Sequence, residues 1–209
     1  MSLNLYLIRH AASTLNSKSI FQPPNTPLSS TVKHQAHKHF SHLINIKFKS
    51  LYSSNLTRAQ QTAQIIANQY RLTTNHLSIL QEWRKPSQLE GLAFDNPEAK
   101  RIIRALQSHR DNPDFIFSDD ESFRQFTNRA QQVLDFFENH QSEQSIIAVS
   151  HAHLIRAIIL KLLLGKHLNQ VKYWQLTSVL VHSHLGITHL RLSPPNNWQI
   201  ISWNSHVYQ

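Results

Sequence analysis

Short apolar runs alternate along the chain with longer stretches in which apolar residues recur at helical spacing. Leu3–Ile8 and Ser145–Val149 are largely apolar, as in strands that are buried on both faces of a sheet. Ser50–Ser53 and Leu77–Leu80 are shorter runs that we also interpret as strands. Because strands that alternate with helices form a largely parallel sheet, the pattern predicts an α/β protein.

Five stretches are predicted to be helices from their apolar stripes and from the residues that begin or end them. They span about residues 30–46, 56–70, 98–109, 121–140 and 154–164. Towards the C-terminus, β-rich composition predicts strands at Val179–His182, Ile187–Leu192 and Trp198–Trp203. The turn-forming residues Pro194–Asn197 make the last two a hairpin.

These elements predict a single domain over residues 1–209. The fold class is α/β, a three-layer α/β/α sandwich with a mostly parallel central sheet and one antiparallel strand or hairpin near the C-terminus. From about residue 85 to 144 the alternation stops, and an Asp-rich loop with Pro113 separates two helices. We therefore expect a helical cap insertion at about 85–144 that covers the strand ends.

The chain has no cysteine, which excludes disulfide scaffolds, cysteine-based zinc sites and cysteine nucleophiles. A reducing, cytoplasmic location is compatible with this composition. No secretory signal is visible, since the first apolar run is short and ends in Arg9. Leu154–Leu164, the best membrane candidate, is too short to span a bilayer. We expect a soluble, cytoplasmic protein with no membrane partner.

The formal net charge of +9 favours anionic partners. The basic residues are scattered in ones and twos, with no run of five or more. Binding to nucleic acid is therefore not expected, because such binding usually shows clustered basic residues.

Reactive side chains follow each of the four predicted parallel strands. Arg9 and His10 end the first strand, and Arg58 lies one helical turn after the second. Glu82 follows the third strand and His151 follows the fourth. The carboxyl ends of parallel strands meet at one edge of the sheet, where ligands bind in open α/β folds. We therefore expect these side chains to gather in one site.

This set of two imidazoles, two guanidinium groups and one carboxyl group suits phosphoryl transfer. Cations can hold the non-bridging oxygens, an imidazole nitrogen can attack phosphorus, and an acid can protonate the leaving oxygen. A metal site would need more carboxylates, and a serine triad would need a base and an orienting acid beside the serine. Burial would raise the pKa of Glu82 and nearby cations would lower it, and the sequence leaves this balance open.

Four motifs resemble those of the histidine phosphatase superfamily, the phosphoglycerate-mutase-like fold. They are Arg9–Thr14 with Asn16, Ser53–Ala63, Leu80–Glu82, and Val149–Ala152 with Arg156. Their order and spacing agree with the family over the whole chain. The resemblance implies a metal-independent phosphatase that forms a phosphohistidine and has no organic cofactor.

The resemblance also implies a role for each matching residue. His10 is the expected nucleophile, and Glu82 is expected to protonate the leaving oxygen and then to take a proton from the attacking water. Arg9, Arg58 and His151 are expected to bind the phosphoryl group, with Asn16 assisting. Gln22 and Ala152 are further expected substrate-binding positions. The expected ligand is a small phosphorylated substrate or inorganic phosphate.

The sequence departs from the family pattern in two places. Ala11 and Ala152 stand where glycines are common, which is tolerable if the backbone φ there is negative. The segment after Glu82 does not resemble that of the glycolytic mutases, which favours a hydrolase acting on a small phosphorylated metabolite.

Three alternatives remain open from the sequence alone. A phosphomutase or a protein phosphohistidine phosphatase could use the same fold and residues. A non-catalytic scaffold could bind phosphorylated ligands without turnover, because fold and motifs do not prove catalysis. The chain could also form a homodimer.

Overall fold

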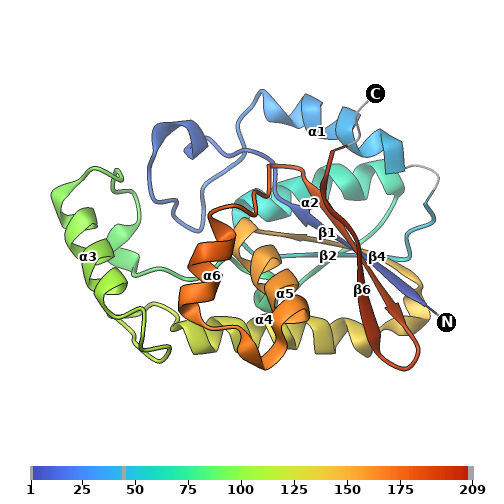
Figure 1. The fold of residues 1–209 in the computed structure, drawn as a ribbon. Coiled ribbons are helices and arrows are strands. Elements are labelled where there is room, and N and C mark those ends of the chain that lie inside the picture. Colours follow the sequence, from blue (N-terminus) through green and yellow to red (C-terminus); the bar gives the residue numbers. More distant parts are fainter. Residues whose placement is uncertain (1, 44–45, 207–209) are drawn as a thin grey trace.

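The computed structural model describes residues 2–43 and 46–206. Its centre is a six-stranded sheet in the order β3-β2-β4-β1-β5-β6 (Figure 1). The strands are β1 Leu3–Arg9, β2 Ser50–Ser53, β3 Thr74–His76, β4 Ser145–Ser150, β5 Ile187–Ser193 and β6 Asn197–Ser205. The pairs among β1 to β4 are parallel, whereas β5 runs antiparallel to β1 and forms a hairpin with β6. The predicted mostly parallel sheet with a C-terminal hairpin is confirmed.

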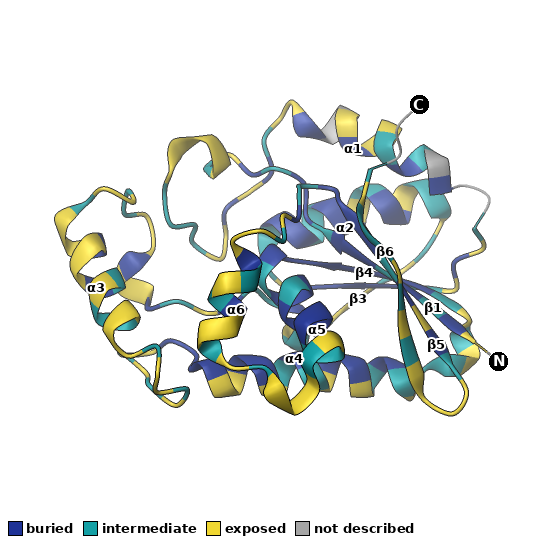
Figure 2. Ribbon diagram, viewed as in Figure 1, coloured by how far each residue is buried: buried dark blue, intermediate teal, exposed yellow. Residues whose placement is uncertain are grey.

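Helices cover both faces of this sheet (Figures 1 and 2). The α-helices of the described residues are α1 Val32–Phe40, α2 Thr57–Tyr70, α3 Pro97–Ser108, α4 Phe123–Glu138, α5 Ala152–Leu164 and α6 Gln170–Thr177. α1 and α2 pack on one face, and α4 and α5 pack on the other. The three-layer sandwich is therefore also confirmed. None of the helices in the described part of the chain is both long and apolar enough to cross a bilayer.

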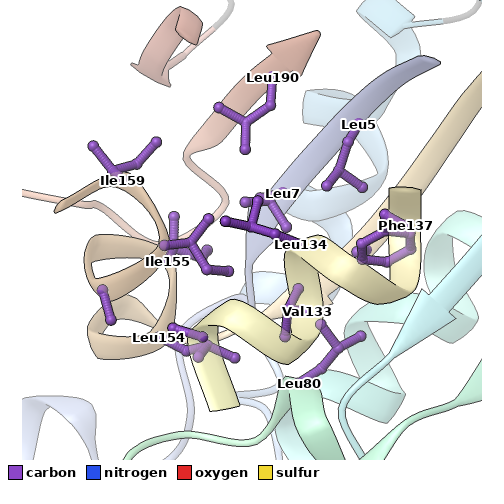
Figure 3. Packing of buried hydrophobic residues seen from close by; sticks show 14 of the residues in the cluster. Leu5, Leu7, Leu80, Val133, Leu134, Phe137, Leu154, Ile155, Ile159 and Leu190 are labelled. Carbon is purple, nitrogen blue, oxygen red and sulfur yellow. The ribbon is translucent and has the colours of Figure 1, made fainter. Parts of the chain in front are cut away.

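Side chains alternate along the central strands and so divide the core into two layers. Leu5 and Leu7 of β1 pack with α4 and α5, as Figure 3 shows. Ile147 and Val149 of β4 point the other way and pack with α1 and α2. All four side chains are fully buried, and burial of a side chain of this size stabilises a fold by about 1.5–3 kcal/mol. The two central strands are thus held from both faces up to their carboxyl ends.

The expected cap insertion at about 85–144 divides into two different parts. α3 has a small apolar cluster of its own, built on Leu89, Ala99 and Ile102, and stands away from the sheet (Figure 1). α4 packs on the sheet beside α5, because its apolar stripe belongs to the main core. We use the name cap for the segment from about 85 to 122, which precedes α4, and the insertion at about 85–144 stays a prediction.

Two strand predictions are wrong. Leu77–Leu80 is not a strand, since β3 lies earlier and Ser78–Leu80 is a 3₁₀ turn. Leu80 is fully buried against α4 instead of pairing in the sheet. Val179–His182 is not a strand either, and its two valines, Val179 and Val181, are exposed instead of packing in a sheet.

The helix α6 is absent from the sequence prediction. Asn169 begins it by accepting a hydrogen bond from the Lys172 backbone N–H at 2.9 Å, an N-cap arrangement that stabilises a helix by about 1 kcal/mol. Of its eight residues only Tyr173 and Thr177 are buried. So few buried positions leave a weak apolar stripe, which explains why the pattern missed it.

Candidate active site

The carboxyl ends of β1 and β4 bring the two candidate histidines together. Arg9 is opposite Ser150 in the parallel register, so the next residues, His10 and His151, lie side by side. Their ring centroids are 5.0 Å apart, and both residues are buried. Arg58 reaches the same cleft from the first turn of α2, directly after β2.

One ring nitrogen of His10 is free to act as a nucleophile. Its Nδ1 lies 2.7 Å from the carbonyl oxygen of Ala11. A carbonyl oxygen only accepts, so Nδ1 carries the hydrogen and Nε2 holds the lone pair. Burial lowers the pKa of His10 well below 6.5, and the neighbouring His151 and Arg58 lower it further. The ring is therefore neutral at physiological pH.

Four buried donors at this site have no hydrogen-bond partner within the described chain. They are Nε of Arg9, Arg58 and Arg156, and Nδ1 of His151. A buried polar group left without a partner costs about 1–3 kcal/mol. These donors together therefore suit a ligand that is rich in acceptor oxygens.

The Ser54 hydroxyl is the hydrogen-bond partner of His151. This hydroxyl lies 2.9 Å from His151 Nε2 and accepts from the Leu56 backbone N–H at 3.2 Å. A hydroxyl can donate as well as accept, so it can donate to Nε2 in the tautomer that carries the imidazole hydrogen on Nδ1, and we take this tautomer as the one that binds a ligand because Nδ1 has no partner in the described chain. Burial lowers the pKa of His151 to about 3. His151 is therefore a neutral donor at physiological pH.

The two arginines keep their charge in spite of burial. Burial lowers the pKa of Arg9 to about 10, and it also lowers the pKa of Arg58. The carboxylate of Glu82 opposes the shift in both cases. Neither arginine belongs to an ion pair of the described residues, so both can pair with an anion in the cleft.

Glu82 lies against the N-terminus of α5. Its carboxylate accepts from the backbone N–H of Trp83 at 3.0 Å and from those of His153 and Leu154 at 3.3 Å each. Burial raises the pKa of this carboxyl group, but His153 and His151, which become charged at the low pH where Glu82 titrates, and the N–H bonds outweigh burial and bring the pKa to about 2. The sequence alone did not decide whether burial or the nearby cations would dominate. In the structure the effects that lower the pKa are larger, so Glu82 is ionised at neutral pH, as expected for a carboxylate at a helix N-terminus.

Arg129 of α4 holds the segment that carries Glu82. Its guanidinium group donates to the carbonyl oxygens of Ile79, Gln81 and Glu82 at 3.0, 2.7 and 3.2 Å. It also pairs with Glu121 at 2.6 Å, with both side chains mostly buried. The sequence analysis did not single out Arg129, because a cation in an amphipathic helix gives no sign of what it contacts.

Asn16, Gln22 and Ala152 all line the cleft. Asn16 Oδ1 accepts from the Ser13 backbone N–H at 2.7 Å, and the Ser13 hydroxyl lies 2.8 Å from Asn16 Oδ1 and 2.9 Å from Gln22 Oε1, so Ser13 contacts both amides. Ala152 is the first residue of α5. Neither Ala11 nor Ala152 has a positive φ, so alanine fits in place of the family's common glycine without backbone strain.

His184 is a site residue that the sequence analysis missed. Its Nδ1 lies 3.1 Å from the His10 carbonyl oxygen, and its Nε2 lies 3.2 Å from Arg9 Nη2. Arg9 also donates from Nη1 to the His182 carbonyl oxygen. The loop before β5 thus fixes the Arg9 guanidinium group. Among fifteen histidines, a loop histidine with no strand end beside it could not be selected from the pattern.

The cleft over these residues has a volume of about 520 Å³. Strand-end residues line it together with cap residues such as Leu89 and Phe94. In the part of the chain that the structure describes, no group of three or more His, Cys, Asp or Glu residues is arranged to hold a metal ion.

The fold and this site define a member of a phosphoryl-transfer family. The profile of the histidine phosphatase superfamily, branch 1, matches residues 5–206, and the chain belongs to this family.

Two curated relatives are phosphatases by name. The chain is 28% identical over 134 residues to the fructose-2,6-bisphosphatase TIGAR of Mus musculus, a match that covers 63% of this chain and 49% of that protein. It is 24% identical over 170 residues to the adenosylcobalamin/alpha-ribazole phosphatase of Escherichia coli K12, covering 77% of this chain and 79% of the relative. The chain thus spans about half the length of the first relative and most of the second.

A solved structure supports the fold. The alpha-ribazole phosphatase of Shigella flexneri superposes with a TM-score of 0.79 at 21% identity, over 97% of this chain and 96% of that one. At this identity the likeness concerns the architecture of the chain.

Proposed function

We propose that this protein is a metal-independent phosphomonoester hydrolase that acts on a small phosphorylated metabolite through a phosphohistidine intermediate. The observation that carries the proposal is the neutral His10 ring, whose Nε2 holds a lone pair, among buried donors that have no partner in the described chain. The names of the curated relatives agree with a small phosphorylated substrate.

In the first step, His10 Nε2 attacks phosphorus and the bond from phosphorus to the leaving oxygen breaks. Arg9, Arg58 and the Nδ1–H of His151 bind the non-bridging oxygens, where negative charge accumulates. Glu82 delivers a proton to the leaving oxygen, so the product alcohol departs neutral and the enzyme holds N-phosphohistidine. In the second step, Glu82 removes a proton from water, the water oxygen attacks phosphorus, and inorganic phosphate and free His10 are released.

The proton for the first step has to enter with the substrate. Glu82 is ionised at neutral pH, since its pKa is about 2 before substrate binds. A phosphomonoester has a second pKa near 6, so its monoanion carries one proton into the cleft. The negative charge of the bound phosphate raises the pKa of Glu82, which favours transfer of that proton to the carboxylate. This account favours activity on the acid side of neutral.

The two other enzyme classes on this fold predict different products. A phosphomutase would return the phosphoryl group to a second small molecule instead of to water. A protein phosphohistidine phosphatase would need a cleft open to a protein side chain. The cleft here is partly covered by the cap residues Leu89 and Phe94, which favours a small substrate.

The test is hydrolysis of p-nitrophenyl phosphate between pH 5 and 8 in the presence of EDTA. We expect activity in the unchanged protein and its loss in His10→Ala, together with an alkali-stable, acid-labile phosphoprotein in quenched reactions of the unchanged protein. His76→Ala is the matched control, because His76 is exposed on the edge strand β3 and should retain full activity.

Three outcomes would count against the proposal. Activity that disappears with EDTA and returns with a metal ion would contradict metal independence. Full activity in His10→Ala would contradict a phosphohistidine intermediate on His10. If neither protein hydrolyses any phosphomonoester but both bind inorganic phosphate by calorimetry, the non-catalytic scaffold would be the better account. A cytoplasmic location and a homodimer stay predictions.

A further inference from the structure

A second cavity, of about 260 Å³, adjoins the catalytic cleft. We call it the side cavity. Phe21, Trp83, Arg84, Lys85 and His153 line both the side cavity and the cleft. The two spaces are therefore neighbours that share one wall. None of the roles assigned so far uses the side cavity.

Aromatic rings from separate segments form much of its wall. Trp83 follows Glu82, and Trp174 comes from α6; their ring centroids are 5.5 Å apart with 26° between the planes. His109 and Phe115, from the cap just after α3, stack with centroids 3.9 Å apart and 4° between the planes. Rings attract other rings in offset-stacked and edge-to-face arrangements, so this wall suits a flat, ring-bearing group.

The position of Glu82 points the leaving group towards this cavity. The leaving oxygen has to meet the Glu82 carboxylate, which the backbone N–H groups of Trp83 and His153 hold in place. Both of these residues line the side cavity. Glu82 itself lines the cleft, whereas Trp83 and His153 line both spaces. A carbon skeleton that extends from the leaving oxygen along these two residues therefore enters the side cavity.

Two cations lie over the indole rings of this wall. Lys85 Nζ is 3.6 Å from the centroid of a Trp83 ring, and the Arg110 guanidinium carbon is 5.0 Å from that of a Trp174 ring. Neither cation belongs to an ion pair of the described residues. A ligand ring placed here gains contacts with the rings and a cation–π contact with Lys85 or Arg110.

The volume of the side cavity is sufficient for one ring and a short linker. A dry protein cavity of about 150 Å³ is sufficient for benzene, and the side cavity is larger than that. A small polyol would leave the aromatic wall in contact with water and would gain little from it.

We propose that the side cavity is the leaving-group site, and that the preferred substrates are phosphomonoesters of alcohols that carry an aromatic or heteroaromatic ring. This inference rests on the proposed phosphatase function, and in particular on the contact of Glu82 with the leaving oxygen.

The test compares two phosphomonoesters whose leaving groups have similar pKa values, 3-phenylpropyl phosphate and propyl phosphate. We expect kcat/KM to be about 10- to 100-fold higher for the phenyl compound, because burial of a phenyl-sized group contributes about 1.5–3 kcal/mol. The corresponding phosphonates, which cannot be hydrolysed, are compared by calorimetry, and we expect the phenyl compound to bind about tenfold tighter or more.

A pair of variants locates the effect. Gln107 is exposed on α3 and lines the side cavity, so Gln107→Trp should fill the cavity from a position that tolerates change. We expect this variant to lose most of the preference for the phenyl compound and to keep the rate with propyl phosphate. Arg104→Trp is the matched control, since Arg104 is exposed on the same helix and lines neither space.

The outcomes separate this inference from the proposed function. Equal kcat/KM and equal phosphonate binding for the two compounds would overturn the leaving-group site while the phosphatase stands. A phenyl preference that survives Gln107→Trp would also overturn it, because the ring would then bind elsewhere. If no compound is hydrolysed, the proposed function fails, and the ratio of the two phosphonate affinities still decides whether the side cavity binds a ring.

Discussion

The phosphate end of the cleft and the cap that faces it are built in different ways. His10 and His151 follow the two central strands, and both are buried beside a core that packs on both faces of the sheet. The cap rests on a small separate cluster around Leu89 and Ile102. Groups that perform the chemistry are thus placed by the largest core of the molecule. The cap residues that we propose to contact the leaving group, such as His109 and Phe115, lie on a part that can change without disturbing the sheet.

The largest effect is expected for Glu82→Gln, which tests the phosphate end of the cleft. The amide cannot deliver a proton, so we expect kcat/KM to fall about 10²–10⁴-fold with an alkyl phosphate and much less with p-nitrophenyl phosphate, whose leaving group needs no acid. Steady-state kinetics on both substrates measure the difference. An equal loss on the two substrates would remove Glu82 from the acid role.

Arg58→Met should separate activity from stability at the phosphate end. Loss of one charged donor to the non-bridging oxygens is expected to lower kcat/KM about 10²–10³-fold. Arg58 is buried without an ion-pair partner in the described chain, so an apolar side chain of similar length should leave the melting temperature unchanged or higher. A large drop in melting temperature would show that Arg58 supports the fold instead.

Leu89→Ala examines the cap side of the comparison. We expect a cost of about 2–3 kcal/mol, confined to the cap because the cluster of Leu89, Ala99 and Ile102 is separate from the main core. Hydrogen exchange should become faster in α3 and stay unchanged in β1 and β4. Equal acceleration in β4 would mean that cap and sheet unfold as one unit.

The pH profile tests the phosphate end alone. Burial lowers the pKa of His10 well below 6.5, so its protonation should reduce the rate only at distinctly acid pH. Above about pH 6 the substrate loses the proton that Glu82 needs. We expect kcat/KM for an alkyl phosphate to fall about tenfold per pH unit there, as measured between pH 4.5 and 9. A rate that climbs steadily to pH 9 would refute this scheme.

The smallest effect is expected for Ala152→Gly. Ala152 does not have a positive φ and begins α5, so restoring the family's common glycine relieves no strain. Glycine within a helix costs up to about 1 kcal/mol relative to alanine, and kcat/KM should change by less than about threefold. The measurement is kcat/KM of Ala152→Gly and of Ala11→Gly beside the unchanged protein. A large increase in kcat/KM in either variant would show that the alanine constrains the site.

The sequence was sufficient for those parts of the site that follow from strand order. His10 and His151 could be placed together because both follow buried apolar runs, and parallel strands put such residues at one edge. Glu82 also lines the cleft, although it follows a 3₁₀ turn and not a strand. In each case the apolar residue before the reactive one, such as Ile8 or Leu80, is buried in the core.

Contacts that arise only when distant segments meet could not be predicted. Arg129 and His184 reach the site through backbone carbonyl groups of other segments, and carbonyl groups have no signature in a sequence. Val179–His182 has strand-like composition, but composition does not tell whether a segment finds a strand to pair with, and Val179 and Val181 are exposed here. A helical stripe likewise does not tell which core it joins, so the packing of α4 in the main core could not be predicted.

The position of β1 has a consequence for how the protein is made. β1 precedes the other strands in the chain, yet it lies in the middle of the sheet between β4 and β5. At synthesis rates of roughly 5–20 residues per second, several seconds or more must pass before β4 can pair with it. During that interval its apolar residues have no partner strand, so they stay exposed on the nascent chain, and His10 and His151 can come together only after β4 has been synthesised.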